Sequence, residues 1–165
     1  MKRRSTPDQV RKVVQYNPDT GELYWLFDTP SRGRRKGDIA DRPSKTGRRF
    51  ICLLNDNVQS THAIWAIVYG KWPERYIDHI NLNHADNRLC NLREATGSQN
   101  AANRVVSKRN PTGRKGVTLL PSGRFSAQIV VKCQPQWLGS FETADEASDA
   151  YKGAALLVFG EFAKI

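Results

Sequence analysis

The 165-residue chain has only three cysteines, and no two of them form a C-x-x-C pair. Cys52, Cys90 and Cys133 are far apart and odd in number, so they indicate neither a disulfide framework nor a zinc site built from thiolates. Free cysteines of this kind are typical of a protein in a reducing compartment.

Long apolar runs are also missing. The longest, AIWAIV at residues 63–68, is far shorter than the roughly 20 apolar residues that a membrane-spanning helix requires. The basic N-terminus MKRRSTPDQVRK is not followed by an apolar segment, so it lacks the pattern of a signal peptide. We therefore expect a cytoplasmic protein with no membrane partner. Apolar residues make up 39% of the chain, enough for modest cores in one or two domains.

Acidic residues are too few to balance the basic ones. The chain has 26 Lys and Arg against 16 Asp and Glu, which gives a formal net charge of +10. This charge favours a polyanionic partner, most simply nucleic acid, because each neutralised phosphate releases counterions. Two segments carry much of the excess, with eight basic residues in 32–49 and five in 104–115. Each segment is either a solvated face or a phosphate-binding surface, and the glycines between the charges favour the second.

Turn and capping signals predict the secondary structure of the first hundred residues. A hydroxyl followed by proline at residues 5–8 predicts the start of a helix. Alternating residues predict a hairpin at 50–61, and the spacing of apolar residues then predicts a helix over 62–70. A short strand follows at 76–80. Thr96 and Gln99 form the signature of a capping box, which predicts another helix.

The last third of the chain has a different pattern. Three short strands are predicted at 116–120, 124–131 and 136–141, followed by a helix that begins at a capping box, Thr143 with Glu146. We therefore predict an α+β fold with a first domain, a basic linker and a small three-stranded antiparallel sheet packed on one helix. Their predicted limits are residues 1–104, 105–114 and 115–165.

One polar stretch, DHINLNHADNRLCNLREATGSQN at residues 78–100, holds two histidines, two aspartates and five asparagines. Asparagine is a poor former of helices and strands, so this crowding requires a reason. Asp78 and His79 end a predicted strand, and Asn100 lies in the first turn of the next helix. Together they offer oxygen ligands for a hard divalent cation and a base for water, the groups needed to hydrolyse a phosphodiester. The alternative is structural, with a buried histidine and with Asn87 and Asn91 capping turns.

The stretch resembles the HNH motif of ββα-metal nucleases, especially the homing type of phages and introns, and the resemblance extends over about residues 14–104. It implies an N-terminal ββα-metal nuclease domain. It implies that His79 is the general base, that Asn91 braces the loop and orients His79, and that Asp78 and Asn100 bind one divalent ion. Ligands that are all oxygen favour Mg²⁺ or Mn²⁺ over Zn²⁺.

Three further residues of this region have less certain roles. Arg88 and Arg93 either clamp DNA phosphates or pair with neighbouring acids, Asp86 and Glu94, and the sequence does not decide between these roles. His84 is expected to be exposed to solvent or to face DNA.

Residues 115–162 resemble the DNA-binding domain of plant ethylene-response factors, through GV at 116–117, GRF at 123–125, WLG at 137–139 and the helix that follows. In that family the sheet lies in the major groove of DNA. Two arginines and a tryptophan of the family are replaced by Thr118, Leu120 and Ser122, so its GC-rich target is not implied here. Residues proposed to contact DNA in this part are Arg114, Lys115, Arg124, Gln128, Lys132 and Trp137. Trp137 is as readily a core residue, whereas Phe125 is expected to pack against the helix.

These features together predict a site-preferring endonuclease of the homing type that acts on double-stranded DNA in the cytoplasm of an infected or host bacterial cell. A single HNH site favours a monomer that nicks one strand, whereas a double-strand cut requires a dimer or two nicks. One alternative is a non-catalytic DNA-binding regulator on a degenerate HNH scaffold. Another is a protein that binds or cleaves RNA.

Overall fold

The structure is a computed structural model that describes residues 5–29, 33–53 and 56–165. It contains helices and several small antiparallel sheets, and it divides into two compact units, Met1–Glu94 (unit 1) and Ala95–Ile165 (unit 2). Arg32 of the first basic segment and residues 54–55 of the predicted hairpin lie outside the described residues. Within the described residues, no helix has the length and hydrophobicity to cross a bilayer.

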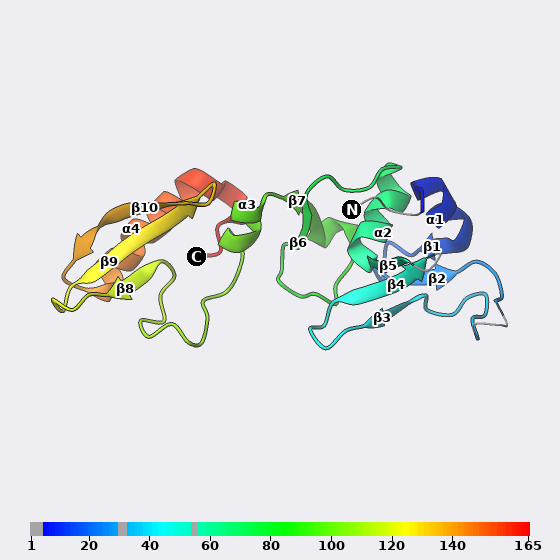
Figure 1. Ribbon diagram of the computed structural model, residues 1–165, viewed down its shortest axis with the longest axis horizontal. Helices are drawn as coiled ribbons and strands as arrows, with labels where there is room; N and C mark the ends of the chain where they lie inside the picture. Colours follow the sequence, from blue (N-terminus) through cyan, green and yellow to red (C-terminus); the bar gives the residue numbers. More distant parts are fainter. Residues whose placement is uncertain (1–4, 30–32, 54–55) are drawn as a thin grey trace. The chain divides into compact units, whose positions relative to one another are not determined.

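Unit 1 begins with α1 (Pro7–Val13), whose N-cap is Thr6 in a capping box. Its strands form three small sheets (Figure 1). The first pairs β1 (Val14–Tyr16) with β2 (Leu23–Trp25), and the second has the order β3 (Asp41–Pro43), β4 (Arg49–Leu53), β5 (Asp56–Gln59). Helix α2 (Ser60–Tyr69) then ends at Gly70. The third sheet pairs β6 (Tyr76–His79) with β7 (Leu92–Ala95), which follows a short 3-10 helix at Leu89–Asn91.

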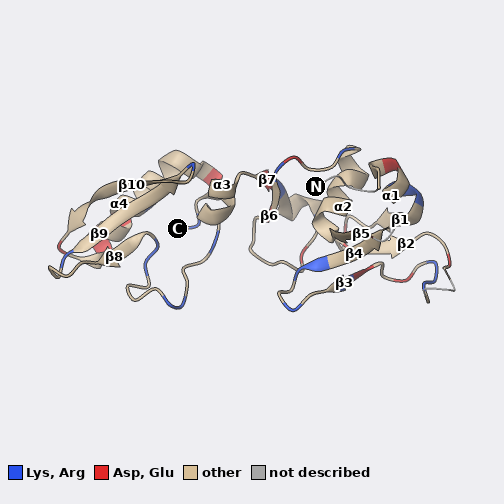
Figure 2. Cartoon of the chain, in the orientation of Figure 1, with Lys and Arg blue, Asp and Glu red and all other residues tan. Residues whose placement is uncertain are grey.

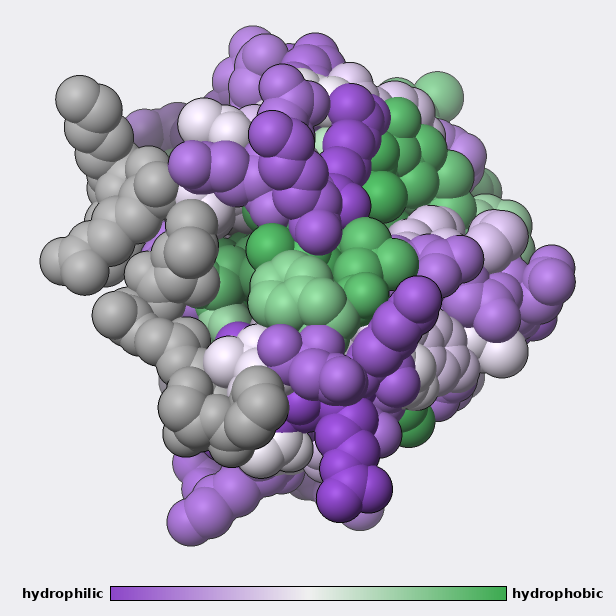
Figure 3. Space-filling view, turned by 90° about the vertical axis from the view of Figure 1, so that its right-hand side faces the viewer, coloured by the Kyte–Doolittle hydropathy of each residue, from purple (hydrophilic) through white to green (hydrophobic). Residues whose placement is uncertain are grey.

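The core of unit 1 draws one side chain or more from nearly every element. Val10 of α1, Leu23 of β2, Ile51 of β4, Ile64 of α2 and Leu92 of β7 belong to one buried cluster. Leu92 therefore anchors the β6–β7 pair to the core of the unit, so the strands on either side of the polar loop are held in place. The outside of the unit, seen from the side of α1 and β2, is mostly hydrophilic around one apolar area (Figure 3).

Unit 2 begins with a short helix, α3 (Gly97–Ala102), which has the predicted capping box of Thr96 with Gln99. The three strands β8 (Val117–Leu119), β9 (Phe125–Val131) and β10 (Gln134–Phe141) form an antiparallel sheet in the order β10-β9-β8. Helix α4 (Ala144–Phe159) follows and begins at the predicted N-cap, Thr143. These elements confirm the predicted strands and helix to within about two residues.

Every second residue of β9 points into the core of unit 2. Ala127 clusters with Val117 and with Ala147 of α4, while Ile129 clusters with Tyr151 of α4. Phe125 packs against the first of these clusters, as the sequence predicts. Helix α3, which is predicted to belong to the first domain, contributes Ala102 to a core cluster of unit 2.

Candidate active site and DNA-facing residues

The loop between β6 and the 3-10 helix, residues 80–88, is held closed by one asparagine. The Asn91 side-chain oxygen accepts a hydrogen bond from the backbone N–H of Asn81 at 2.9 Å, and its amide nitrogen donates to the Asp86 carbonyl at 2.8 Å. The backbone carbonyl of Asn91 also accepts from the N–H of Ile80 at 2.9 Å. Asn91 is buried, so it joins both ends of the loop at a site shielded from water.

His79 is buried at the end of β6, with 5% of its surface exposed, and its ring is held by a second asparagine. Its Nε2 lies 3.0 Å from the side-chain oxygen of Asn87, which is 1% exposed. Because an amide oxygen only accepts hydrogen bonds, Nε2 carries the proton and Nδ1 keeps the lone pair that can accept one. The sequence predicts only a turn-capping role for Asn87. Nothing in its spacing from His79 distinguishes it from the other asparagines of the loop.

His84 lies against His79 and is only partly exposed, so it is not the fully exposed side chain that was expected, while its other expected role, facing DNA, stays a prediction. The two Nδ1 atoms are 3.4 Å apart, and the rings meet edge to face. Burial lowers the pKa of His84, and the positive charge of Arg48 lowers it further. His84 is therefore neutral at neutral pH, and its N–H is the donor that meets the lone pair of His79.

A small hollow opens beside the two histidines. Its volume is about 10 Å³, near the lower limit for holding one water molecule. Its lining comes from β4 and the residue before it, β5, α2, β6 and the loop, and consists of Arg48, Arg49, Gln59, Thr61, Ile77, His79, His84 and Asn87. Arg49 is held by Asp41 at 2.7 Å. The first basic segment thus brings two arginines to the lining of this hollow, a placement that its charge alone did not predict.

Asp78, the predicted metal ligand, is buried and paired with an arginine. The Arg93 Nε lies 3.1 Å from its Oδ2, and the Arg93 side chain is 12% exposed. The acid that Arg93 contacts is thus Asp78, which the sequence did not single out as its partner, and its expected role as a phosphate clamp stays a prediction. The Glu94 carboxylate instead accepts the backbone N–H of Glu74 at 2.9 Å.

Arg88 pairs with Asp86, one of the two roles left open by the sequence. Two of its nitrogens each lie 2.8 Å from an oxygen of Asp86. The hydrogen bonds from Arg88 lower the pKa of Asp86, and the same contacts raise the pKa of Arg88. This pair fixes the end of the loop next to Asn87.

The predicted metal ligands have donor atoms that a hard divalent ion accepts. Asp78, at the end of β6 in unit 1, has a carboxylate, and Asn100, on α3 in unit 2, has an amide oxygen. Among the described residues, no three His, Cys, Asp or Glu side chains gather into a metal-binding group. Any ion bound here would therefore rely on water or phosphate for most of its ligands, as Mg²⁺ usually does.

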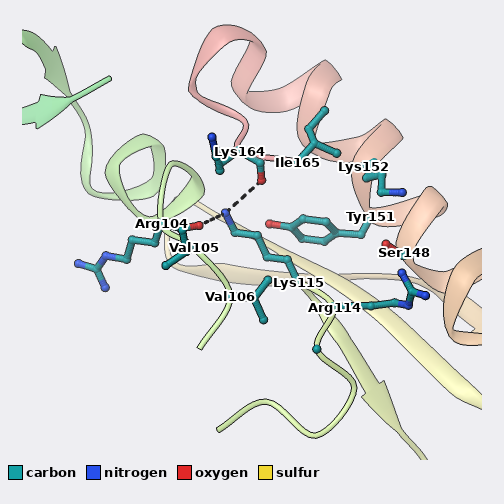
Figure 4. Close-up of a pocket in the computed structure, with 11 residues that line it drawn as sticks. Arg104, Val105, Val106, Arg114, Lys115, Ser148, Tyr151, Lys152, Lys164 and Ile165 are labelled. Atoms are coloured by element: carbon teal, nitrogen blue, oxygen red, sulfur yellow. Dashed lines mark hydrogen bonds between the residues drawn. The ribbon is translucent and has the colours of Figure 1, made fainter. Parts of the chain in front are cut away.

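Two of the residues proposed to contact DNA, Arg114 and Lys115, have their charged groups bonded to other residues of unit 2. The Lys115 ammonium group donates to the carbonyls of Ala102, Arg104 and Lys164, the last two at 2.7 and 3.4 Å (Figure 4). It lines a cavity of about 280 Å³, and burial lowers its pKa. The neighbouring Arg114 pairs with Asp145 of α4.

The other candidates lie on the sheet of unit 2 or at its ends. Gln128 is exposed on β9, and Trp137 on β10 is 71% exposed, which excludes the alternative of a core tryptophan. Arg124 and Lys132 stand at the two ends of β9, beyond its last strand residues. The strand ribbons are accordingly tan along their length, with blue near the ends (Figure 2).

Comparison with known proteins confirms both resemblances. Residues 62–102 match the family model of the HNH endonucleases. An uncharacterized HNH endonuclease of Acanthamoeba polyphaga mimivirus is 34% identical over 98 residues, 59% of this chain and 50% of the relative. An ethylene-responsive transcription factor of Arabidopsis thaliana is 37% identical over 84 residues, 50% of this chain and 24% of that protein. Another such factor, from Lotus japonicus, is 51% identical over 47 residues, 27% of this chain and 18% of that protein.

The chain covers only part of each of these relatives, half of the mimivirus protein and less than a quarter of the two plant factors described. No solved structure gives a significant match.

Proposed function

We propose that the chain is a site-preferring DNA endonuclease of the homing type, in which unit 1 hydrolyses the phosphodiester and unit 2 holds the DNA. The observation that carries this proposal is the setting of His79. His79 has its Nε2 held by Asn87 and lines a hollow of about the size of one water molecule. The matches to HNH endonucleases and to ethylene-responsive factors support the two halves of the proposal.

His79 acts as the general base in this proposal. Its Nδ1 takes a proton from a water in the hollow, and the resulting hydroxide attacks the phosphorus. Asn87 holds the proton on Nε2, which keeps Nδ1 basic, and it stabilises the imidazolium that forms. Asn91 keeps the loop closed, so the distance between His79 and Asn87 is maintained. Arg48 and Arg49 bring positive charge to the phosphate.

A divalent ion, Mg²⁺ or Mn²⁺, is part of the proposal. Asp78 and Asn100 would hold it, with Arg93 orienting the Asp78 carboxylate. When bound, such an ion polarises the scissile phosphate and stabilises the departing oxygen.

Division of the work between two units suits a small nuclease site. A site of this kind reacts with any phosphodiester it meets, so sequence preference has to come from a separate surface. The sheet of unit 2 is that surface, with Gln128 and Trp137 facing the bases and Arg124 and Lys132 near the phosphates. With a single histidine site, one chain nicks one strand, and a double-strand cut requires a second copy or a second nick.

The test is cleavage of a supercoiled plasmid by the full chain in Mg²⁺, in Mn²⁺ and in EDTA. We expect relaxed circles with either metal, none in EDTA, and a loss of at least about 100-fold in His79→Ala. His62→Gln is the matched control, because His62 lies on α2 of the same unit and should leave the rate unchanged.

Linear product in place of nicked circles would contradict the single-strand assignment. Binding to DNA without cleavage of a duplex that carries a selected binding site would contradict catalysis and would support a DNA-binding regulator. Preference for RNA over duplex DNA in competition would contradict both.

A further inference from the structure

The outer face of the sheet in unit 2 carries no ionisable side chain along its strands. Strand register places Ser126 between Thr118 and Ser140, Gln128 beside Trp137, and Val130 beside Pro135. Residues that face each other across antiparallel strands share one side of the sheet. The opposite side holds Phe125, Ala127 and Ile129, which pack with α4. The outer face is thus made of hydroxyl, amide and apolar groups.

The cations of this face stand only at its two ends. Arg124 precedes β9 and is bound to β10, with its Nε 3.2 Å from the Ser140 hydroxyl and its Nη2 3.0 Å from the Ser140 carbonyl. Lys132 lies in the turn between β9 and β10, where its φ of 49° is in the left-handed region. Arg124 therefore has part of its donor fork occupied, and the two charges flank the uncharged centre.

These side chains match one kind of base pair. In the major groove, guanine is read mainly by arginine or lysine, whereas adenine is read by the amide of glutamine or asparagine. The thymine methyl group is read by apolar contact. Gln128 supplies the amide, and Thr118, Val130 and Trp137 supply exposed apolar surface next to it.

We propose that this face recognises A·T pairs in the major groove, with Gln128 bonded to an adenine and its neighbours packed on thymine methyl groups. Arg124 and Lys132 contact phosphates on either side and position the sheet. This inference rests on the proposed DNA binding by unit 2 and adds the class of sequence that is bound. A·T preference here follows from the exposed groups of these strands, because Arg124 and Lys132 lie outside the limits of β9.

The test begins with selection of bound duplexes from a random library by the full chain, in EDTA so that no DNA is cut. A·T pairs should be enriched at the contacted positions, and a selected duplex should bind at least about tenfold more tightly than one with these pairs replaced by G·C. Deoxyuridine in place of thymidine removes only the methyl group. It should weaken binding about three- to tenfold where the apolar residues make contact.

Two variants separate recognition from general binding. Gln128→Ala should lose preference at an adenine position, while Gln136→Ala should not, because Gln136 is an exposed glutamine of the same hairpin whose register with Ile129 places it on the opposite face. Val130→Arg should shift the selected sequences toward guanine. Melting curves check that each variant is folded.

Selection of G·C-rich sites, or binding with no change on deoxyuridine substitution and in Gln128→Ala, would overturn the A·T inference and leave DNA binding in place. Failure of the chain to retain any duplex would overturn the proposed DNA binding itself, and this inference with it.

Discussion

The two units use polar residues in opposite ways. Around His79 in unit 1, the polar side chains of Asn87, Asn91 and Asp78 are buried, and each has a fixed partner. On the sheet of unit 2 the polar and apolar groups are exposed, and Gln128 and Trp137 point into solvent. A group that performs chemistry must be held before the substrate arrives, whereas a group that reads a surface must remain free to meet it.

Charge differs in the same sense. In unit 1, Arg93 is paired with Asp78 and Arg49 with Asp41, so each of these two arginines holds a neighbouring carboxylate in place. Cations of the sheet lie at its ends and leave its centre neutral. The difference predicts that single substitutions in unit 1 reduce the rate of cleavage, while those on the sheet of unit 2 change where and how tightly DNA is bound.

Asp78→Asn provides the largest expected effect. The amide keeps a hydrogen-bond acceptor for Arg93 but removes the anionic oxygen, so we expect cleavage in Mg²⁺ to fall about a thousandfold with DNA affinity in EDTA unchanged. Plasmid relaxation and gel-shift titration measure the two quantities. Glu94→Gln, a charge change on the adjacent strand, is the control. A fully active Asp78→Asn enzyme would refute the metal assignment.

A pair of glycine substitutions tests directly whether cleavage depends on unit 1 and DNA binding on unit 2. Gly21 has a φ of 77°, and a Cβ there would lie 2.6 Å from the Arg88 nitrogen and 2.7 Å from the Asn87 carbonyl carbon. Gly21→Ala must therefore displace the backbone that carries Asn87, and we expect cleavage to fall roughly 100-fold while DNA is still bound.

Gly116→Ala is the counterpart in unit 2. At Gly116 the φ is 69°, and a Cβ would overlap the ring of Tyr151 and approach the Gln128 carbonyl to 2.6 Å. We expect a loss of about 2–3 kcal/mol in unfolding free energy and a loss of DNA affinity. Denaturant unfolding and gel shifts measure both. Equal loss of binding in the two glycine variants would contradict separate roles.

Asn91→Ala should have an intermediate effect. It removes both side-chain bonds that close the loop, so we expect about 10- to 100-fold slower cleavage and a loss of roughly 1–3 kcal/mol in stability. Asn83→Ala is the matched control, because Asn83 is an exposed asparagine of the same loop whose change should stay within about 0.5 kcal/mol. If both variants behaved alike, the bracing role of Asn91 would be lost.

The smallest effect is expected at His84. Its Nδ1 meets the lone pair of His79 that has to accept the proton of water, so the contact must open before reaction. His84→Ala should therefore raise cleavage a few-fold at saturating DNA. A decrease in turnover, with KM unchanged, would show instead that His84 assists the reaction.

Local signals in the sequence determined most of the secondary structure. The hydroxyl caps at Thr6, Thr96 and Thr143 and the glycine at the end of α2 act within one turn of chain, so they can be read without the fold. The alternation in β9 likewise gave the packing of Phe125. The polar stretch at 78–100 was visible as an anomaly of composition, and its motif was enough to find the HNH resemblance.

Only the tertiary structure decided which side chains meet. The partner of Arg93 is Asp78, 15 positions earlier, and the partner of the His79 ring is Asn87 rather than any other asparagine of its loop. Lys115 is a residue type that commonly binds phosphate, yet its ammonium group donates hydrogen bonds to three carbonyls of its own unit. The physical reason is that chemical type limits what a side chain can bind, whereas the packing of distant strands and loops determines which of its possible partners comes within a hydrogen bond.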